Sequence, residues 1–449
     1  MKKLILKGYL KQSTSRLNPS VTVVLSFFVL ILVGTVLLKL PIATTETISW
    51  LNTLFTATSA VTVTGLIVVD TGTAFTLFGQ TVIMFLMQIG GLGLMTAAVF
   101  IFFIFKRKIS MQQRNLIKES LNQDSSGGII RLVRYLFFFS FSIELIGFIL
   151  LSIKWIPEFG LSKGAFYSLF HTVAAFNNAG FSLWSDNLSS YVGDPIVNLT
   201  ITSMFILGGI GFTVLLDVWN KKKFKTLTLH SKVMIVGTLV INISAVISIF
   251  ILEYSNPQTL GSLSFEDKMW SAYFQGLTPR TAGFNSIDIT ALTLPSMLLT
   301  VLLMFIGAGS ASTGSGIKLS TFIILLLTTI TFLKGGEEVS LFGRRLKNSA
   351  VLRALTLTLI SFLLVFVAIF ILAVTENESF IAIVFEVVSA FGTVGLSTGL
   401  TTELSTIGRF VIMVVMFIGR IGPITIASIL LTRKKTSLIR YPQEDIFVG

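Results

Sequence analysis

Long apolar runs dominate the chain and recur along its whole length. A helix needs roughly 20 apolar residues to cross about 30 Å of hydrocarbon, and most of these runs are long enough. The pattern therefore predicts an all-α integral membrane protein with eight spans. The runs cover residues 21–40, 81–105, 135–153, 197–218, 233–252, 296–306, 354–374 and 407–431.

Four segments between these runs share one pattern, namely an aromatic-rich helix, a short polar run, and a glycine followed by an apolar residue. A helix of about a dozen residues rises only about 18 Å, so each segment must enter the membrane and return on the same side. Each repeat is therefore expected to contain a helix, a re-entrant pore helix plus filter, and a second helix. The segments are 55–66 (FTATSAVTVTGL), 170–181 (FHTVAAFNNAGF), 273–284 (YFQGLTPRTAGF) and 385–396 (FEVVSAFGTVGL).

A second glycine motif follows each segment at a nearly constant distance, inside the next apolar run or, in the third repeat, directly after it. The motifs are GGLG from Gly90, GGIG from Gly208, GAGS from Gly307 and GRIG from Gly419. Two motifs in one register argue against chance agreement. Because each unit crosses the membrane an even number of times, four parallel pseudo-repeats can surround one central pore. For the second set of glycines, close helix packing is the favoured interpretation.

These repeats divide the chain into successive blocks. We expect pore repeats at residues 21–118, 119–225, 226–347 and 348–435, with a distinct intramembrane loop at 307–317 in the third. Residues 1–20 are expected to form a cytoplasmic N-terminus and 436–449 a cytoplasmic C-terminal tail. The run Ser264, Phe265, Glu266, Asp267 has the pattern of a capping box that begins the third pore helix.

Charge orients this arrangement. The net charge is +13, but Lys and Arg gather in every second connection, whereas the other connections carry mostly Asp and Glu. By the positive-inside rule, the basic connections and both termini are cytoplasmic. Membrane lipid is therefore the expected environment, and no nucleic-acid partner is expected. The basic clusters lie within residues 2–16, 106–134, 221–232, 334–353 and 433–440.

Composition excludes several chemistries. The 449 residues are 53% hydrophobic and 12% charged, which is typical of a chain whose main solvent is lipid. The absence of cysteine rules out disulfides and thiolate catalysis, and two histidines cannot build the usual zinc or haem site. Together with few clustered carboxylates, this argues against an enzyme and against a covalent cofactor.

The four stretches that end in the shared glycines, called the glycine stretches below, are candidates for a cation filter. Non-helical backbone at membrane depth is tolerated only where protein buries it or a watery cavity adjoins it. Carbonyl oxygens there can replace the hydration shell of an ion, and the C-terminal ends of the short helices favour a cation. Packing is the competing explanation for any single glycine. The glycine stretches are Thr62, Val63, Thr64 and Gly65; Asn177, Asn178, Ala179 and Gly180; Arg280, Thr281, Ala282 and Gly283; and Gly392, Thr393, Val394 and Gly395.

Across essentially its whole length the chain resembles the Trk/Ktr/HKT superfamily of potassium transporters, and within it the membrane subunits of bacterial Ktr systems (KtrB/KtrD type). The resemblance rests on the glycine stretches, on GAGSASTGSGIK from Gly307 and on GRIGP from Gly419. It implies potassium as the transported ion, one filter glycine per repeat, and sodium as a candidate activator. In the plant branch a serine at the first filter glycine accompanies sodium selectivity, so Gly65 favours potassium.

The resemblance also implies partners and a location. It predicts a homodimer that rests on a cytosolic RCK-type regulatory ring (KtrA/KtrC type) binding ATP or ADP, with the basic loops as the contact surface. Topology and anionic lipid alone would also explain basic loops. The implied location is the bacterial plasma membrane, with several passes.

The third repeat departs from the others in a way that indicates a gate. After Ile306 the chain is rich in Gly, Ser and Thr, so the span is expected to break, and the resemblance assigns this loop as the moving barrier. A harmless kink is the alternative. Arg420 is expected to donate to this loop and hold it, whereas Lys318 either takes part in gating or snorkels to the interface. The candidate gate residues are Gly307, Gly309, Ser310, Ser312, Thr313, Gly314, Ser315, Gly316, Lys318 and Arg420.

Five further polar residues lie in or near apolar segments. Glu144, Asp217, Glu253 and Glu386 could mark a proton or sodium path, but structural pairing is the favoured interpretation. His171 is expected to be a hydrogen-bonded packing residue and not a ligand.

Two functions remain compatible with the sequence. The leading hypothesis is channel-like potassium uptake driven by the membrane potential, at about 2.3 kcal/mol per charge per 100 mV. The alternative is a secondary transporter coupled to sodium or another solute, which inverted repeats would support. The repeats found in the sequence are parallel.

Overall fold

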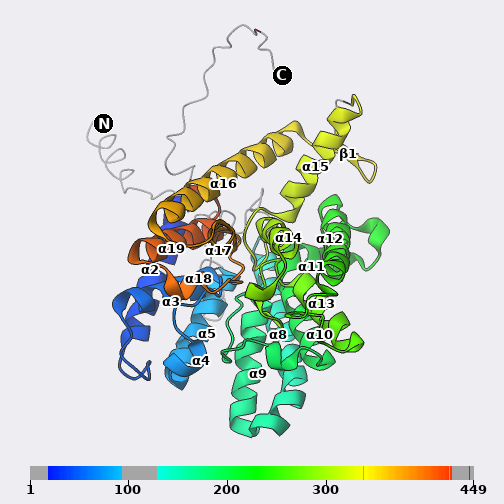
Figure 1. Ribbon diagram of the computed structural model, residues 1–449. Helices are drawn as coiled ribbons and strands as arrows, with labels where there is room; N and C mark the ends of the chain where they lie inside the picture. Colours follow the sequence, from blue (N-terminus) through cyan, green and yellow to red (C-terminus); the bar gives the residue numbers. More distant parts are fainter. Residues whose placement is uncertain (1–18, 94–128, 337, 424, 427–443, 445–449) are drawn as a thin grey trace, which may run out of the picture.

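The computed structural model describes residues 19–93, 129–336, 338–423, 425, 426 and 444, and these residues are mainly helical (Figure 1). The described part therefore has the predicted all-α class, with one small hairpin of strands β1 (Ser340–Leu341) and β2 (Arg344–Arg345). Several predicted segments lie wholly or partly outside the described residues. They are the cytoplasmic N-terminus except its last two residues, the end of the apolar run 81–105, residues 106–128 of the basic cluster 106–134, and nearly all of the C-terminal tail.

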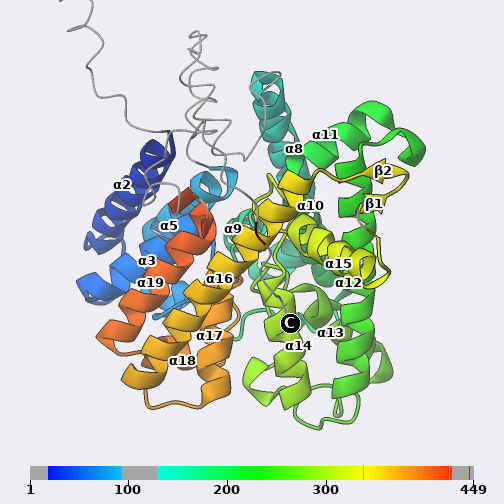
Figure 2. The ribbon, with the colours of Figure 1, turned by 90° about the horizontal axis from the view of Figure 1, so that it is seen from above.

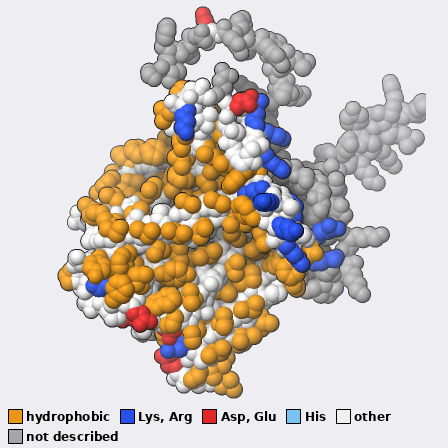
Figure 3. Space-filling model, turned by 90° about the vertical axis from the view of Figure 1, so that its right-hand side faces the viewer, with side chains coloured by type: hydrophobic (Ala, Val, Ile, Leu, Met, Phe, Trp, Pro, Cys, Tyr) orange, Lys and Arg blue, Asp and Glu red, His pale blue; other side chains and the backbone are white. Residues whose placement is uncertain are grey.

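Each repeat opens with a long apolar helix. The four helices are α2 (Pro19–Lys39), α8 (Ile129–Phe159), α12 (Leu229–Glu253) and α16 (Asn348–Thr375), and within the described residues these four are long and apolar enough to cross a membrane. Their outward side chains, such as Leu239 on α12 and Phe366 on α16, are exposed in the isolated chain. Figure 3 shows one face covered mostly by hydrophobic side chains, with most Lys and Arg at its upper and right-hand edge. Such a continuous apolar surface is suited to lipid.

A helix too short to span follows in each repeat. These four helices, called the short helices below, are α3 (Trp50–Thr62), α9 (Leu161–Phe176), α13 (Phe265–Leu277) and α17 (Phe380–Gly392). The predicted start of α13 at Ser264 is confirmed, because the hydroxyl oxygen of Ser264 accepts the N–H of Asp267 at 3.2 Å and the hydroxyl donates to the Asp267 carboxylate at 2.8 Å. The C-terminal halves of the short helices are buried, whereas most residues of their first turns are exposed or half-buried.

A second helix completes each repeat, and it stops or bends at the second glycine motif. These helices are α5 (Leu77–Leu92), α10 (Pro195–Ile210), α14 (Leu294–Phe305) and α19 (Thr406–Ile421). The apolar run 197–218 does not form one straight helix, since α10 and α11 (Phe212–Lys221) meet at an angle of 93°. The cause is Gly211, whose φ of 108° is incompatible with a helix. In the third repeat the predicted break is confirmed, with a loop between α14 and α15 (Leu319–Leu333).

The repeats pack in a closed cycle. The second helix of each repeat contacts the short helix of the next, through the pairs α5 with α9, α10 with α13, α14 with α17, and α19 with α3. The last pair closes the cycle by joining the two ends of the chain, and α19 lies beside α3 and α5 in Figure 2. Four equivalent contacts of this kind bring the glycine stretches, which follow the short helices, toward one place.

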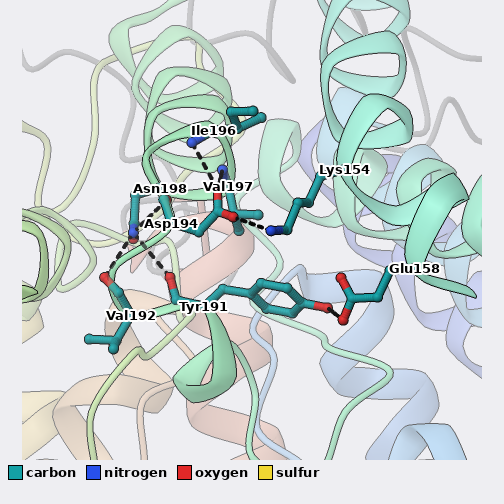
Figure 4. Close-up of polar contacts among 8 residues, drawn as sticks. All are labelled: Lys154, Glu158, Tyr191, Val192, Asp194, Ile196, Val197 and Asn198. Carbon is teal, nitrogen blue, oxygen red and sulfur yellow. Dashed lines mark hydrogen bonds and ion pairs between the residues drawn. The ribbon is translucent and has the colours of Figure 1, made fainter.

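Short elements connect these helices at the ends of the bundle. They are α4 (Thr71–Ala74), α18 (Leu400–Glu403) and the 3₁₀ turns η1 (Ser189–Tyr191), η2 (Phe224–Thr226) and η3 (Ile289–Ala291). Around η1, a polar cluster fastens the loop before α10 to the end of α8 (Figure 4). Lys154 forms an ion pair with Asp194 at 2.8 Å, and Tyr191 donates to Glu158 at 2.9 Å. Asp194 also caps α10 by accepting two of its first N–H groups at 2.9 and 3.1 Å.

Candidate functional site

The four glycine stretches share one backbone conformation. In each, the second residue and the glycine have positive φ, a combination that turns the chain sharply out of the short helix. The third residue then donates its N–H back to the last turns of the preceding helix or the turn after it, for example from Thr64 to the carbonyl of Ser59 at 2.8 Å. The φ values are 58° and 90° for Val63 and Gly65, 59° and 66° for Asn178 and Gly180, 68° and 77° for Thr281 and Gly283, and 48° and 94° for Thr393 and Gly395.

The four glycines lie against one another in cyclic order, and this arrangement is called the glycine ring below. A Cβ added to any of them would approach the carbonyl oxygen of the residue before the next glycine. These distances are 2.3 Å from Gly65 to Ala179, 3.0 Å from Gly180 to Ala282, 2.1 Å from Gly283 to Val394 and 2.2 Å from Gly395 to Thr64. A side chain does not fit at any of the four corners without displacing backbone, since the Cβ added to Gly180 would also lie 2.9 Å from the Cα of Gly283. The ring therefore consists of backbone, and carbonyl oxygens are hard ligands suited to a bare cation.

Serine hydroxyls on the short helices hold two corners of the glycine ring from behind. The hydroxyl oxygen of Ser59 accepts the N–H of Gly65 at 3.0 Å, and that of Ser389 accepts the N–H of Gly395 at 3.2 Å. Sequence reasoning missed both serines, although each lies six residues before a shared glycine. In the third stretch the side chain of Arg280 leaves the ring and donates to Asn242 on α12 at 2.8 Å.

Three of the six glycines in the second set pack as predicted, namely Gly90, Gly208 and Gly419, whereas Gly93, Gly211 and Gly422 have φ of 84°, 108° and 97° and end the helix at each motif. A Cβ at Gly90 or Gly208 would lie 2.0 Å from the carbonyl oxygen of Val61 or Phe176, and one at Gly419 would lie 2.2 Å from that of Phe391. Each of these carbonyls belongs to the last turn of the short helix in the same repeat. Absence of a side chain thus lets the second helix touch the backbone that leads into the glycine ring.

The loop of the third repeat lies directly against the second and third glycine stretches. The amide group of Asn178 is 2.9 Å from the hydroxyl of Thr313 in the loop and 3.1 Å from that of Thr281. The loop also pairs with the break between α10 and α11, because Gly309 donates to the carbonyl of Gly209 at 2.7 Å and Phe212 donates to that of Ala311 at 2.8 Å. The loop of the third repeat therefore packs against the bend at Gly211.

Arg420 joins the last helix to this loop. Its guanidinium donates to the carbonyl oxygens of Thr313, of Gly90 at 2.5 Å and of Gly91 at 2.8 Å. The expected contact between Arg420 and the loop is thus present. Lys318 donates to the carbonyl of Gly314 at 2.8 Å, so it also holds the loop. Within the described residues, neither side chain has a carboxylate within 4.0 Å.

The other predicted candidates are paired. Glu144 on α8 accepts from Gln88 on α5 at 2.9 Å, and Gln88 in turn accepts from the amide of Asn177 at 2.5 Å. Sequence reasoning missed Gln88, which connects a buried carboxyl group to the second glycine stretch. Asp217 pairs with Lys221 at 2.8 Å, and Glu253 accepts from Thr259 at 2.6 Å and from Thr293 at 2.7 Å. The structural interpretation of these three carboxylates is therefore confirmed.

A multi-pass helical membrane protein that presents backbone oxygens at a fourfold ring is of the class that transports ions. Comparison with known proteins agrees, because the family of cation transport proteins named TrkH matches residues 7–439. The chain belongs to this family. It is an ion transporter of the plasma membrane and not an enzyme.

The similarity extends over whole chains. The protein is 56% identical over 434 residues to the Ktr system potassium uptake protein B of Bacillus subtilis, covering 97% of both chains. It is 40% identical over 447 residues to the potassium/sodium uptake protein NtpJ of Enterococcus hirae, covering 98% of this chain and 99% of the other. The crystal structure of the potassium transporter TrkH from Vibrio parahaemolyticus matches with a TM-score of 0.73 and 20% identity, covering 94% of this chain and 86% of that one, which shows a shared fold.

Proposed function

We propose that this protein takes up potassium through a channel-like path in which the four glycine stretches form the selectivity filter. The observation that carries the proposal is the cyclic contact of the four glycines, each facing the carbonyl oxygen that precedes the next. The relatives in Bacillus subtilis and Enterococcus hirae are named for potassium and for potassium/sodium uptake. A ring of carbonyl oxygens can replace the hydration shell of a cation, and the negative ends of four short helices favour its charge.

In this proposal the loop of the third repeat is the gate. It contacts Asn178 of the second glycine stretch through Thr313, and Gly314 packs against Thr281 of the third, so it lies against the ring. In the proposed orientation this is the cytoplasmic side. Arg420 and Lys318 hold it there through backbone carbonyls. Movement of the loop would require these contacts to exchange for water or for other partners.

We further propose eight spans in four repeats with the limits given above, both termini cytoplasmic, a homodimer, and regulation by a cytosolic ring that binds ATP or ADP. Basic residues on the hairpin between α11 and α12, including Lys222 and Lys223, offer a surface for such a ring or for anionic lipid.

Because the chain has no cysteine, single-cysteine variants report topology cleanly. A membrane-impermeant maleimide added outside intact cells should label Asp186→Cys and spare Lys222→Cys, and the reverse pattern would overturn the orientation.

Growth of a bacterium that lacks potassium uptake tests the transport proposal. Expression of this chain with its regulatory partner should restore growth at low potassium. Gly283→Val should not, because its φ of 77° and the carbonyl 2.1 Å from an added Cβ leave no room. Gly335→Val is the matched control, since Gly335 also has positive φ but nothing lies within 4 Å of its added Cβ. Failure of the wild-type chain to restore growth would count against potassium uptake.

A second candidate is transport coupled to sodium, which the name of the Enterococcus hirae relative makes worth testing. Sodium could also act as an activator without being carried. Proteoliposomes separate these cases. Potassium flux that follows the membrane potential alone supports the channel-like path, flux driven by a sodium gradient at zero potential supports coupling, and faster flux with sodium equal on both sides supports activation.

A further inference from the structure

Among the described residues, two opposite corners of the glycine ring share a pair of side chains, a buried acceptor and a half-buried serine, that the other two corners lack. In the fourth repeat, the carboxylate of Glu386 on α17 accepts the hydroxyl of Ser397 at 2.8 Å and also that of Thr401. Ser397 lies two residues after Gly395, and Glu386 lies nine residues before it. The carboxylate therefore ties the short helix to the chain as it leaves the ring.

The second repeat builds the same tie from different residues. His171 and Ser182 lie nine residues before and two residues after Gly180, and the ring nitrogen Nε2 is 3.2 Å from the serine hydroxyl. Because Nδ1 is 2.8 Å from the carbonyl of Tyr167 and donates to it, Nε2 is left as an acceptor, like the carboxylate of Glu386. His171 and Glu386 are both fully buried.

The serines match in a second respect. The hydroxyl oxygen of Ser182 accepts the N–H of Trp184 at 3.0 Å, and that of Ser397 accepts the N–H of Gly399 at 3.0 Å. Each serine hydroxyl therefore faces an acceptor on the short helix and accepts from the backbone two residues further on. In the second repeat the Ser182 hydroxyl also lies 3.4 Å from the carbonyl of Asn187, and Nε2 of His171 also accepts the N–H of Leu183 at 3.4 Å. The two turns that follow the glycine ring are held in one geometry by an acceptor that differs in chemical type.

The first and third repeats lack this pair in the described part of the chain. The positions equivalent to Glu386 are Thr56 and Phe274, and those equivalent to Ser397 are Ile67 and Asn285. Thr56 donates to the carbonyl of Asn52 in its own helix at 2.9 Å. In the cyclic order of contacts, the second and fourth repeats face each other across the ring.

We propose that His171 and Glu386 are positioning residues that determine the selectivity of the transporter, by holding two opposite glycines of the ring at fixed separation through Ser182 and Ser397. A ring that discriminates between potassium and the smaller sodium ion depends on the number and placement of its carbonyl oxygens. The tie fixes the residue two positions beyond each glycine, so its loss frees that corner to move inward. This inference rests on the proposed filter function.

The experiment measures the ratio of potassium to sodium flux in proteoliposomes. Ser397→Ala and Ser182→Ala should each lower this ratio by roughly fivefold to tenfold, the size expected from the loss of one typical hydrogen bond. Ser397→Thr keeps a hydroxyl and should keep most of the ratio. Glu386→Gln keeps one acceptor oxygen, so its flux ratio should lie between that of the wild type and that of Glu386→Leu.

The equivalent position of the first repeat provides the matched control. Thr56→Ala removes a hydroxyl that bonds only within α3, so its flux ratio should equal that of the wild type. An unchanged ratio in Ser397→Ala and Ser182→Ala, with potassium flux intact, would overturn the inference. So would an equal fall in Thr56→Ala, which would indicate general loosening. Absence of potassium flux in the wild type would instead reject the proposed function. If an alanine variant does not fold, the flux ratios of Ser397→Thr and Glu386→Gln are compared with that of the wild type instead. Glu386→Gln has lost one acceptor oxygen, so a flux ratio equal to that of the wild type in this variant would count against the proposal.

Discussion

The guanidinium of Arg420 donates to the carbonyl oxygen of Thr313, which lies 107 residues earlier in the chain. The same side chain reaches the carbonyls of Gly90 and Gly91 at the end of α5. One residue of the fourth repeat therefore connects the loop of the third repeat to the second helix of the first. Displacement of the loop must break or stretch this connection.

Arg420→Gln should raise the potassium leak of the transporter without its regulatory partner. Hydrogen bonds from a charged donor contribute about 1.5 to 3 kcal/mol each, so loss of the charge should shift the balance between closed and open loop by roughly tenfold or more. Leak is measured as ion efflux from proteoliposomes. Arg409→Gln is the control on the same helix, because Arg409 donates to Asn52 and to the carbonyl of Thr402, away from the loop. A leak in Arg420→Gln no larger than that of the control would contradict a holding role.

Removal of residues 309–315 should also raise the leak. The two ends of the shortened loop already lie close together, since Gly307 donates to the carbonyl of Ile317 at 2.9 Å, so the deletion can close without moving α14 or α15. The same efflux assay applies. Ser320→Ala loses only a hydroxyl contact with Ser310 at 3.2 Å and should leak at the wild-type level. A deletion variant that folds and carries less ion than the wild type would exclude this loop as the barrier.

Gly65→Ser should weaken the preference for potassium over sodium by roughly tenfold. The serine Cβ would meet the carbonyl oxygen of Ala179 at 2.3 Å, and crowding of this kind costs about 1 to 3 kcal/mol. Relief of the crowding has to displace a carbonyl that faces the ring. Competitive flux of the two ions gives the ratio. Gly160→Ser, with a φ of 81° and nothing within 4 Å of an added Cβ, controls for backbone strain alone. If the ratio of potassium to sodium flux were the same in Gly65→Ser and Gly160→Ser, Gly65 would have no specific role in selectivity.

Glu376, at the end of α16, should give the protein a pH-dependent part of its stability. Burial of its carboxyl group opposes ionisation, but Ser405 donates through its backbone N–H at 2.9 Å and its hydroxyl at 2.6 Å, and the net effect lowers the pKa of Glu376 below 4.5. A lowered pKa means that this stabilisation is complete above pH 4.5 and is lost as the pH falls through the lowered value.

Because solvent screens this partly exposed carboxylate, Glu376→Gln should lower the free energy of unfolding at pH 7 by only about 0.5 kcal/mol, and the difference from the wild type should shrink below pH 4.5. Thermal unfolding in detergent, from pH 7 down to pH 4, measures this difference. Glu378→Gln, at an exposed neighbouring position, should match the wild type throughout. A difference that stays constant with pH would show that the carboxylate charge does not act through Ser405.

Much of the site could be predicted because its elements repeat. Four copies of one pattern placed Gly65, Gly180, Gly283 and Gly395 in the same register, and the structure brings them into contact. The break after Ile306 and the contact of Arg420 with the loop were predictable for a local reason. Gly, Ser and Thr favour a loop over a helix, and a charge at membrane depth needs acceptors.

The bend at Gly211 was missed because an apolar run with one more glycine is equally compatible with a straight helix. Only the contact of this bend with Gly309 and Ala311 in the third repeat decides between the two conformations. The link from Glu144 through Gln88 to Asn177 was missed for a similar reason. It joins three separate helical segments, and no spacing along the chain reveals such a meeting.

A single polypeptide supplies all four corners of the ring, so no symmetry operation forces them to be alike. In an assembly of four identical subunits every substitution appears four times, whereas here a substitution alters one quadrant and leaves three unchanged. The differing acceptors His171 and Glu386 at facing quadrants show that the corners have diverged. Ion preference in such a molecule can change in small, independent increments, one quadrant at a time.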